Sequence, residues 1–265
     1  MPSPRYDEAV FVLLEVKETT TGDIHTPTAT ATAVECSTNN GFLTCWHCIV
    51  ADSAEKIVDR DIIYLELAVT LHVHKAVGGV GFTFSSPIIP VEVIAHNRSN
   101  DWAVLRRTDK VQCSKVIPIC PANSLPDTHK EEQVKYYSYP VAEFLDTGDP
   151  YLTCEPSDYM KVSTYTHHHV KTPVGNVSGS SGGAVVDRAG RLVGIHQESC
   201  NSIKRFADEQ GTKKFKAGEH RAVVEDCLNS VSNSYRNYSY ALVPCRMEKL
   251  MHVLTNMASY PIDEE

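Results

Sequence analysis

Short runs of β-forming residues, separated by turn residues, constrain the fold of this 265-residue chain more than any other feature. Valine, isoleucine, threonine and aromatic residues gather in these runs with partial alternation, which is the pattern of half-buried strands. In the first half, the runs are Val10–Val16, Thr28–Cys36, Phe42–Thr44, Ile62–Val73 and Ile88–Ala95. Long helical patterns do not occur there. Short strands with frequent turns predict an all-β barrel or sandwich.

The second half begins after a segment of different composition. Ile117–Lys130 carries three prolines and little apolar pattern, so we interpret residues 121–132 as a linker. Residues 200–238 are polar and mixed in charge, and we interpret them as an insertion between two late strands. The strands of this half are expected at Gln133–Tyr139, Lys161–His169, Ala184–Val186, Leu192–His196 and Tyr240–Val243. Helical spacing of apolar residues predicts a C-terminal amphipathic helix over residues 246–258.

The net charge and the hydropathy of the chain argue against two classes of binding partner. The net charge is −8, which disfavours nucleic acid as a partner because phosphate binding needs a basic face. No segment has the roughly 20 apolar residues that span a bilayer, so we expect no membrane partner. We find no export signal before the first strand. These features predict an intracellular, cytoplasmic protein.

The nine cysteines fit that location, because an odd number without framework spacing favours free thiols in a reducing compartment. Cys45 and Cys48 have CxxC spacing, but the second pair that a structural zinc site requires is absent. His167 and His169 share one face of an expected strand, and a solvated face explains them better than a metal site. We therefore expect no metal and no cofactor.

Three short segments carry residues suited to nucleophilic catalysis, in the order histidine, aspartate, serine. His47 follows an apolar strand, Asp101 precedes one, and Ser181 stands among glycines directly before another. A serine hydroxyl needs a base within hydrogen-bond reach, and a carboxylate holds the tautomer of that base. Glycines let the chain turn so that amide N–H groups converge on a developing oxyanion. The intervals of 54 and 80 residues leave room for two groups of strands.

These segments resemble those of the chymotrypsin-like serine peptidases. Thr-Cys-Trp-His47-Cys resembles the family's Thr/Ser-Ala-Ala-His-Cys, Asp101-Trp-Ala-Val-Leu its Asp-Ile-Ala-Leu, and Gly-Ser-Ser181-Gly-Gly its Gly-Asp-Ser-Gly-Gly. The resemblance implies a serine endopeptidase with a polypeptide substrate. His47 would be general base and acid, Asp101 would orient it, and Ser181 would be the nucleophile. The amides of Gly179 and Ser181 would form the oxyanion hole.

The resemblance also implies a fold. It predicts two six-stranded antiparallel β-barrels and a C-terminal α-helix, with the triad in the cleft between the barrels. The first barrel would cover residues 1–120 and contain His47 and Asp101. The second would cover residues 133–265, contain Ser181, and include the insertion 200–238 and the helix 246–258.

Departures from the secreted trypsins bear on activation and redox state. Their aspartate before the nucleophile is replaced by Ser180, so the usual zymogen ion pair has no carboxylate partner. We therefore expect activity without N-terminal processing. Cys48 matches the family's bridged cysteine, but its partner position falls near Ala31. The family disulfide is therefore expected to be absent, and the chain resembles bacterial, viral and intracellular members more closely.

The specificity pocket is predicted from positions around the nucleophile. Gly175 stands where trypsin has an aspartate, so basic P1 residues are disfavoured. Gly-Ile-His196 resembles the motif of glutamyl endopeptidases and of picornaviral and potyviral proteases, which implies P1 Glu or Gln. Asn176 would lie on the opposite wall, and protonation of His196 near pH 6.5 would favour Glu. The strand edge that pairs with substrate would be Gln197, Glu198 and Ser199.

Three other interpretations compete with these assignments. His196 is equally well explained as a structural strand histidine. A catalytically silent member of the fold could act as a peptide- or protein-binding module. A non-peptide esterase would have a Gly-x-Ser-x-Gly elbow, which Gly179-x-Ser181-x-Gly183 matches. That class alternates strands with helices and runs serine, acid, histidine, and this chain does neither.

Overall fold

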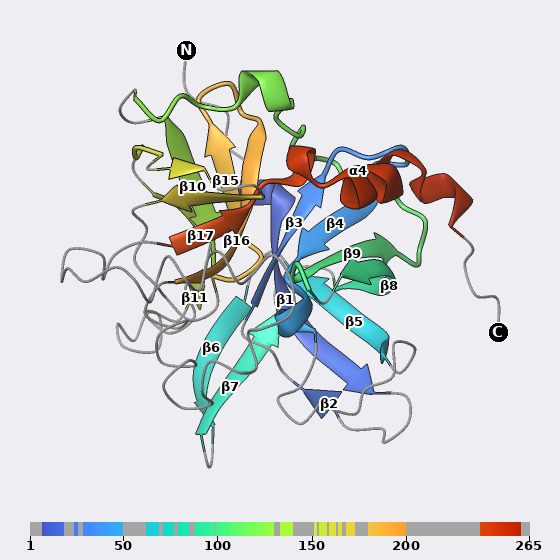
Figure 1. The fold of residues 1–265 in the computed structure, drawn as a ribbon. Coiled ribbons are helices and arrows are strands. Elements are labelled where there is room, and N and C mark those ends of the chain that lie inside the picture. The colour runs from blue at the N-terminus through green and yellow to red at the C-terminus, as the bar shows by residue number, and fades with distance from the viewer. Residues whose placement is uncertain are drawn as a thin grey trace, which may run out of the picture.

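The described part of the chain is mostly β-structure and ends in a C-terminal helix (Figure 1). The computed structural model describes residues 7–18, 24–25, 29–49, 62–68, 71–76, 79–84, 88–97, 99–129, 133–139, 151–152, 154–157, 159–162, 164–165, 168–172, 180–199 and 239–260. Two seven-stranded sheets and a three-stranded sheet make up its strands. All strand pairings within these sheets are antiparallel, which confirms the expected all-β class at the level of two antiparallel sheets.

The first sheet has the strand order β2-β1-β3-β4-β9-β8-β5. Its strands are β1 (Val10–Glu18), β2 (Ile24–His25), β3 (Ala29–Val34), β4 (Gly41–Thr44), β5 (Ile62–Ala68), β8 (Ile89–Asn97) and β9 (Trp102–Arg107). β1 pairs with β3 near its start and with β5 along most of its length. β3 and β4 are buried on both faces, so they form the centre of this half.

The second sheet has the strand order β12-β10-β15-β16-β17-β14-β13. Its strands are β10 (Val134–Ser138), β12 (Glu155–Pro156), β13 (Thr164–Tyr165), β14 (His169–Thr172), β15 (Ala184–Asp187), β16 (Leu192–Ser199) and β17 (Ser239–Leu242). Of the strand expected over Lys161–His169, the described residues Thr164–Tyr165 and His169 are in strands, whereas Lys161, Val162 and His168 are not. The proposed insertion 200–238 lies outside the described residues.

A third sheet, with the strand order β11-β6-β7, was not expected. It consists of the hairpin β6 (Leu71–Ala76) and β7 (Gly79–Phe84), joined by β11 (Tyr151–Leu152). The single strand predicted over Ile62–Val73 is therefore two strands, β5 and β6, in different sheets. β11 comes from the second half of the chain, so this sheet connects the two halves.

The C-terminal helix α4 (Glu248–Thr255) is shorter than predicted, with 3-10 turns η6 (Pro244–Arg246) and η7 (Met257–Ser259) on either side. Four residues of its predicted apolar stripe are buried, since Met247, Leu250, Leu254 and Met257 are at most 6% exposed. The helix follows the second sheet but packs on β9 of the first (Figure 1). The Arg106 guanidinium donates to the carbonyl oxygens of Met257 and Tyr260, which ties the chain end to β9.

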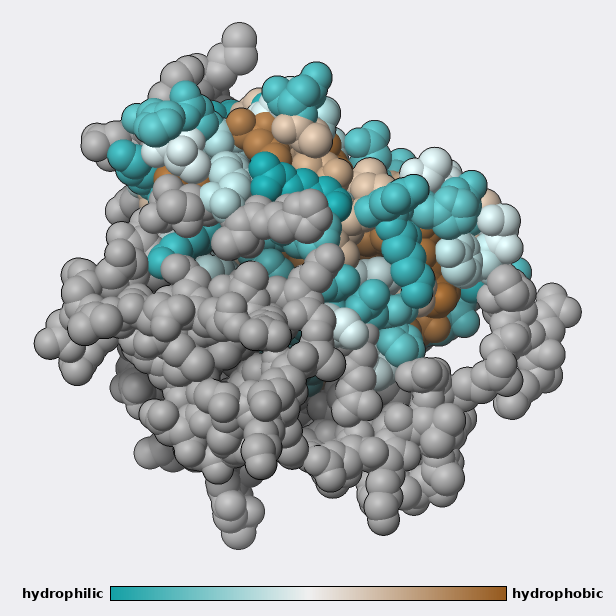
Figure 2. Space-filling view, in the orientation of Figure 1, coloured by the Kyte–Doolittle hydropathy of each residue, from teal (hydrophilic) through white to brown (hydrophobic). Residues whose placement is uncertain are grey.

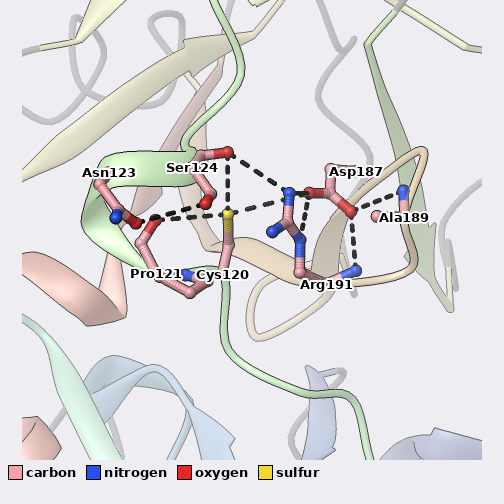
Figure 3. A network of polar contacts seen from close by, with 7 residues as sticks. All are labelled: Cys120, Pro121, Asn123, Ser124, Asp187, Ala189 and Arg191. Carbon is pink, nitrogen blue, oxygen red and sulfur yellow. Dashed lines mark hydrogen bonds and ion pairs between the residues drawn. The ribbon is translucent and has the colours of Figure 1, made fainter.

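The residues directly before the proposed linker are held against the second sheet. Two backbone hydrogen bonds join them to β16, from Leu192 N to Pro118 O and from Cys120 N to Leu192 O. Beyond them, the 3-10 turn η4 (Ala122–Ser124) lies beside the β15–β16 hairpin (Figure 3). There the Asp187 carboxylate accepts from the Arg191 side chain and from two backbone amides of the hairpin.

The surface of the described part is mixed in hydropathy. Among the coloured residues in Figure 2, hydrophilic ones predominate and hydrophobic ones are visible between them. Ile88 and Val111 are the large apolar side chains exposed in the described part. No helix among the described residues is both long enough and apolar enough to cross a bilayer.

Candidate active site

His47 lies in a single 3-10 turn, η2 (Trp46–Cys48), directly after β4. The residues around it are buried, and Trp46 stacks on His96 with ring centroids 4.0 Å apart, which fixes the inner side of the turn. The His47 side chain keeps 48% of its surface exposed. The turn therefore exposes the imidazole to solvent while its buried neighbours hold the backbone in place.

Asp101 reaches His47 from the tight turn between β8 and β9. Its Oδ1 accepts the backbone N–H of His47 at 2.8 Å, and its Oδ2 lies 2.7 Å from His47 Nδ1. Asp101 has φ 50°, a conformation that aspartate and asparagine tolerate better than most residues. A buried carboxylate at Nδ1 favours the tautomer that carries its proton there, which leaves Nε2 free to accept one.

The electrostatics of the turn stabilise the imidazolium. Displacement of water disfavours the charged ring, but the Asp101 carboxylate and the Cys48 side chain outweigh this and raise the pKa of His47 well above its usual value. The Cys45 side chain lowers the pKa of the Cys48 thiol to about 6, and the positive charge of His47 acts in the same direction. Burial raises the pKa of Cys45 well above its usual value.

Ser181 stands in the loop before β15, in the second sheet. Its carbonyl oxygen accepts from Thr30 N at 2.8 Å, and the next carbonyl, that of Gly182, accepts from Thr32 Oγ1 at 2.9 Å. Both donors belong to β3, so the first sheet holds the serine loop of the second. The Ser181 hydroxyl donates to Gln197 O at 3.0 Å, and among the described contacts it makes no hydrogen bond to His47.

Gln197 connects the two halves of the site. It lies at a bulge in β16, and its side chain is buried. Its Nε2 donates to Asn100 O at 2.8 Å and to Asp101 O at 2.9 Å. The sequence predicted Gln197 on the substrate-binding edge but not these contacts, because no local pattern predicts contacts to residues almost one hundred positions away.

Ser180, directly before Ser181, is buried without a charged partner among the described residues. Its hydroxyl accepts from Ser138 Oγ at 3.3 Å, and its carbonyl oxygen accepts from Tyr136 OH at 2.8 Å. Neutral hydrogen bonds therefore hold the position where a secreted trypsin has its aspartate.

His196 is 1% exposed, lies in β16, and contacts the Tyr136 ring edge-on with centroids 5.2 Å apart. Burial, and then the charge on His47, lowers the pKa of His196 to about 3. Titration near pH 6.5 was therefore the wrong expectation, because it assumed a hydrated imidazole. His196 stays neutral at physiological pH.

Other predicted site residues lie outside the described part. Gly175, Asn176 and Gly179 are among them. Glu198 and Ser199 belong to β16, where they pair with β17, and their side chains are not described. On its other side β16 pairs with β15, and this pairing extends only as far as Ile195.

The sequence matches the trypsin-like peptidase domain over residues 31–195, which is more than half of the chain. The chain belongs to this family. Membership of a peptidase family implies a polypeptide substrate. No curated protein matches the sequence.

Two of the solved structures that resemble this trypsin-like peptidase domain have TM-scores above 0.5. A Glu endopeptidase in complex with MPD has a TM-score of 0.56 and 13% identity, covering 98% of this chain and 93% of its own. The active form of a protease from M. tuberculosis has a TM-score of 0.52 and 10% identity, covering 94% of this chain and 82% of its own. At such identities the likeness shows the fold alone.

The cysteines of this trypsin-like domain are free wherever they are described. Seven of the nine fall in the described part, including Cys48, whose family disulfide was expected to be absent. Burial raises the pKa of both Cys113 and Cys120 to about 11, so they should react slowly until the chain unfolds.

We expect thiol titration of the unfolded protein, without reductant, to find most of the nine cysteines reactive. The native protein should titrate fewer, because most of the described thiols are buried. One or no reactive thiol in the unfolded chain would contradict the interpretation.

Proposed function

We propose that the chain is a serine endopeptidase in which Ser181 is the nucleophile, His47 the general base and acid, and Asp101 the group that orients His47. The observation that carries the proposal is the double contact of the Asp101 carboxylate with the His47 amide and Nδ1. A surface ion pair has no need of this arrangement, whereas a catalytic imidazole must be held in one orientation and one tautomer.

The mechanism follows from these positions. His47 Nε2 takes the proton of Ser181 Oγ as that oxygen attacks the peptide carbonyl carbon. The peptide C–N bond then breaks, His47 returns the proton to the leaving amine, and water hydrolyses the acyl-enzyme ester by the same route. The Asp101 carboxylate stabilises the imidazolium formed in each half-reaction. We assign the oxyanion hole to the amides of Gly179 and Ser181.

Before attack, the Ser181 hydroxyl must turn from Gln197 O to His47. Catalytic hydrogen bonds often form only when substrate is bound, so the resting contact is compatible with catalysis. We propose further that each seven-stranded sheet contains one of the family's two six-stranded barrels and one additional strand, and that the barrels are divided at residues 121–132. The pairing of β1 with both β3 and β5 supports this for the first.

For specificity, we propose that His196 lines the P1 pocket and that P1 is Gln or Glu. A neutral imidazole offers one donor and one acceptor, so it can bind a side-chain amide without burying a charge. Because the pKa of His196 is about 3, its ring stays neutral. A neutral ring favours Gln at P1, in place of the preference for Glu at low pH that the sequence suggested. Substrate would pair with the edge of β16 at Gln197–Ser199, beyond Ile195, the last residue that pairs with β15.

The pocket assignment predicts the ranking of matched peptides that differ only at P1. Gln and Glu should give higher kcat/KM than Leu, Phe or Lys, and the Gln/Glu ratio should stay constant between pH 5 and 8. His196→Ala should lower the preference for Gln by about tenfold or more, because a polar P1 group loses its buried partner.

The control is His252→Ala, which removes an exposed histidine on α4 and should leave the ranking unchanged. A higher kcat/KM for Leu, Phe or Lys than for both Gln and Glu would refute the pocket. An unchanged ranking in His196→Ala would do the same. Neither result bears on the triad, which rests on other residues.

A further inference from the structure

We propose that the turn carrying His47 is a binding site for Zn²⁺, and that the bound ion inhibits the peptidase. The site consists of Cys45 Sγ, Cys48 Sγ and a ring nitrogen of His47. Its three donor atoms all lie within 4.8 Å of one another. The inhibition, though not the binding, rests on the proposed function of His47.

The donor set identifies the ion. Two thiolates and an imidazole suit Zn²⁺, and Cys₂His with an open fourth position is an established zinc coordination. From the sequence we expected no zinc, because the second cysteine pair of a structural zinc site is absent. The structure supplies the third donor from within the CxxC segment itself, since η2 turns His47 back toward the two sulfurs.

The distances are close to those that zinc requires. Tetrahedral bonding with Zn–S near 2.3 Å and Zn–N near 2.0–2.1 Å places donor atoms about 3.5–3.8 Å apart. From separations of 4.8 Å or less, small side-chain rotations are sufficient. Binding would displace the thiol proton that Cys45 now donates to His196 O at 3.1 Å.

The surroundings of the site let an ion enter from solvent, and binding of that ion would block catalysis. Cys45 is fully buried and Cys48 is 7% exposed, but the exposed His47 side chain opens the cluster to solvent. One His47 nitrogen holds Asp101, and the other must accept the serine proton. Occupation of either by zinc removes the base from the triad, so the ion and catalysis exclude each other.

The direct test measures binding in the reduced full-length protein, with a chromophoric chelator as competitor for Zn²⁺. We expect Cys45→Ser and Cys48→Ser each to lower the affinity of one site at least tenfold. Cys113→Ser, which removes a free cysteine elsewhere, should have no effect. With Co²⁺ as the probe, wild type should show thiolate charge-transfer bands that both ligand variants lose. Equal Zn²⁺ binding in wild type and both ligand variants would overturn the site.

Activity is the second readout, with each protein compared with its own zinc-free rate. Zn²⁺ should inhibit wild type and Cys113→Ser, a chelator should restore the rate, and Cys48→Ser should resist inhibition. Binding without inhibition of an active enzyme would overturn the assignment of His47 as a ligand. Binding in a protein that hydrolyses no peptide would leave the site standing and count against the proposed peptidase.

Discussion

Asp101→Asn should lower kcat by about 10⁴-fold while the protein stays folded, the magnitude known for this change in a serine-peptidase triad. Asparagine keeps an oxygen to accept the His47 amide and tolerates the φ of 50°. Its NH₂ group, however, would donate to Nδ1 and select the tautomer whose Nε2 already carries a proton. His47 then cannot take the proton of Ser181.

The measurement is kcat and KM on one peptide, with the unfolding midpoint as a check on the fold. Asp109→Asn is the matched control, because it removes an exposed carboxylate that pairs with Arg107 at the far end of β9. Its kcat should match wild type. A loss below tenfold in folded Asp101→Asn would contradict the role assigned to this carboxylate.

Gly182→Ala should destabilise the protein by more than about 4 kcal/mol or prevent folding, which is exceptional for one methyl group. The methyl carbon would lie 1.7 Å from Thr30 O and 2.6 Å from Thr44 Oγ1. Thr30 O cannot move away easily, because Thr30 N and Thr32 Oγ1 both bind this loop. The φ of 87° adds strain of its own.

Urea unfolding of Gly182→Ala and Gly190→Ala separates the two causes. Gly190 has φ 81° in the hairpin between β15 and β16. Its alanine variant therefore measures the cost of this backbone conformation, which should lower the free energy of unfolding by about 1–2 kcal/mol. The Gly182 variant should lose much more, or show no cooperative transition. Equal losses would mean that β3 does not hold the serine loop as described.

Features that depend on neighbouring residues could be predicted from the sequence. The strands β3, β4 and β9 and the buried stripe of α4 follow from local patterns of apolar residues. The motifs around His47, Asp101 and Ser181 are also local. The family whose model matches the chain agrees with the family that these motifs suggested. The positions proposed for catalysis were chosen from these motifs.

Features that depend on distant contacts could not be predicted. The buried amide of Gln197 meets the Asp101 turn only after both sheets have folded. The low pKa of His196 reflects burial by packing that no local pattern encodes. The third sheet pairs Leu71 with Leu152, and a two-residue strand such as β11 leaves no periodic signal.

The central claim is that Ser181 is an activated nucleophile, and a fluorophosphonate probe tests it most directly. The reagent should add once to the native protein, and mass spectrometry should place the adduct on Ser181. Ser180→Ala should still be labelled, whereas Ser181→Ala and heat-unfolded wild type should not. Absence of labelling in folded wild type, or equal labelling of Ser181→Ala, would contradict the claim and favour a silent member of the fold that binds peptides.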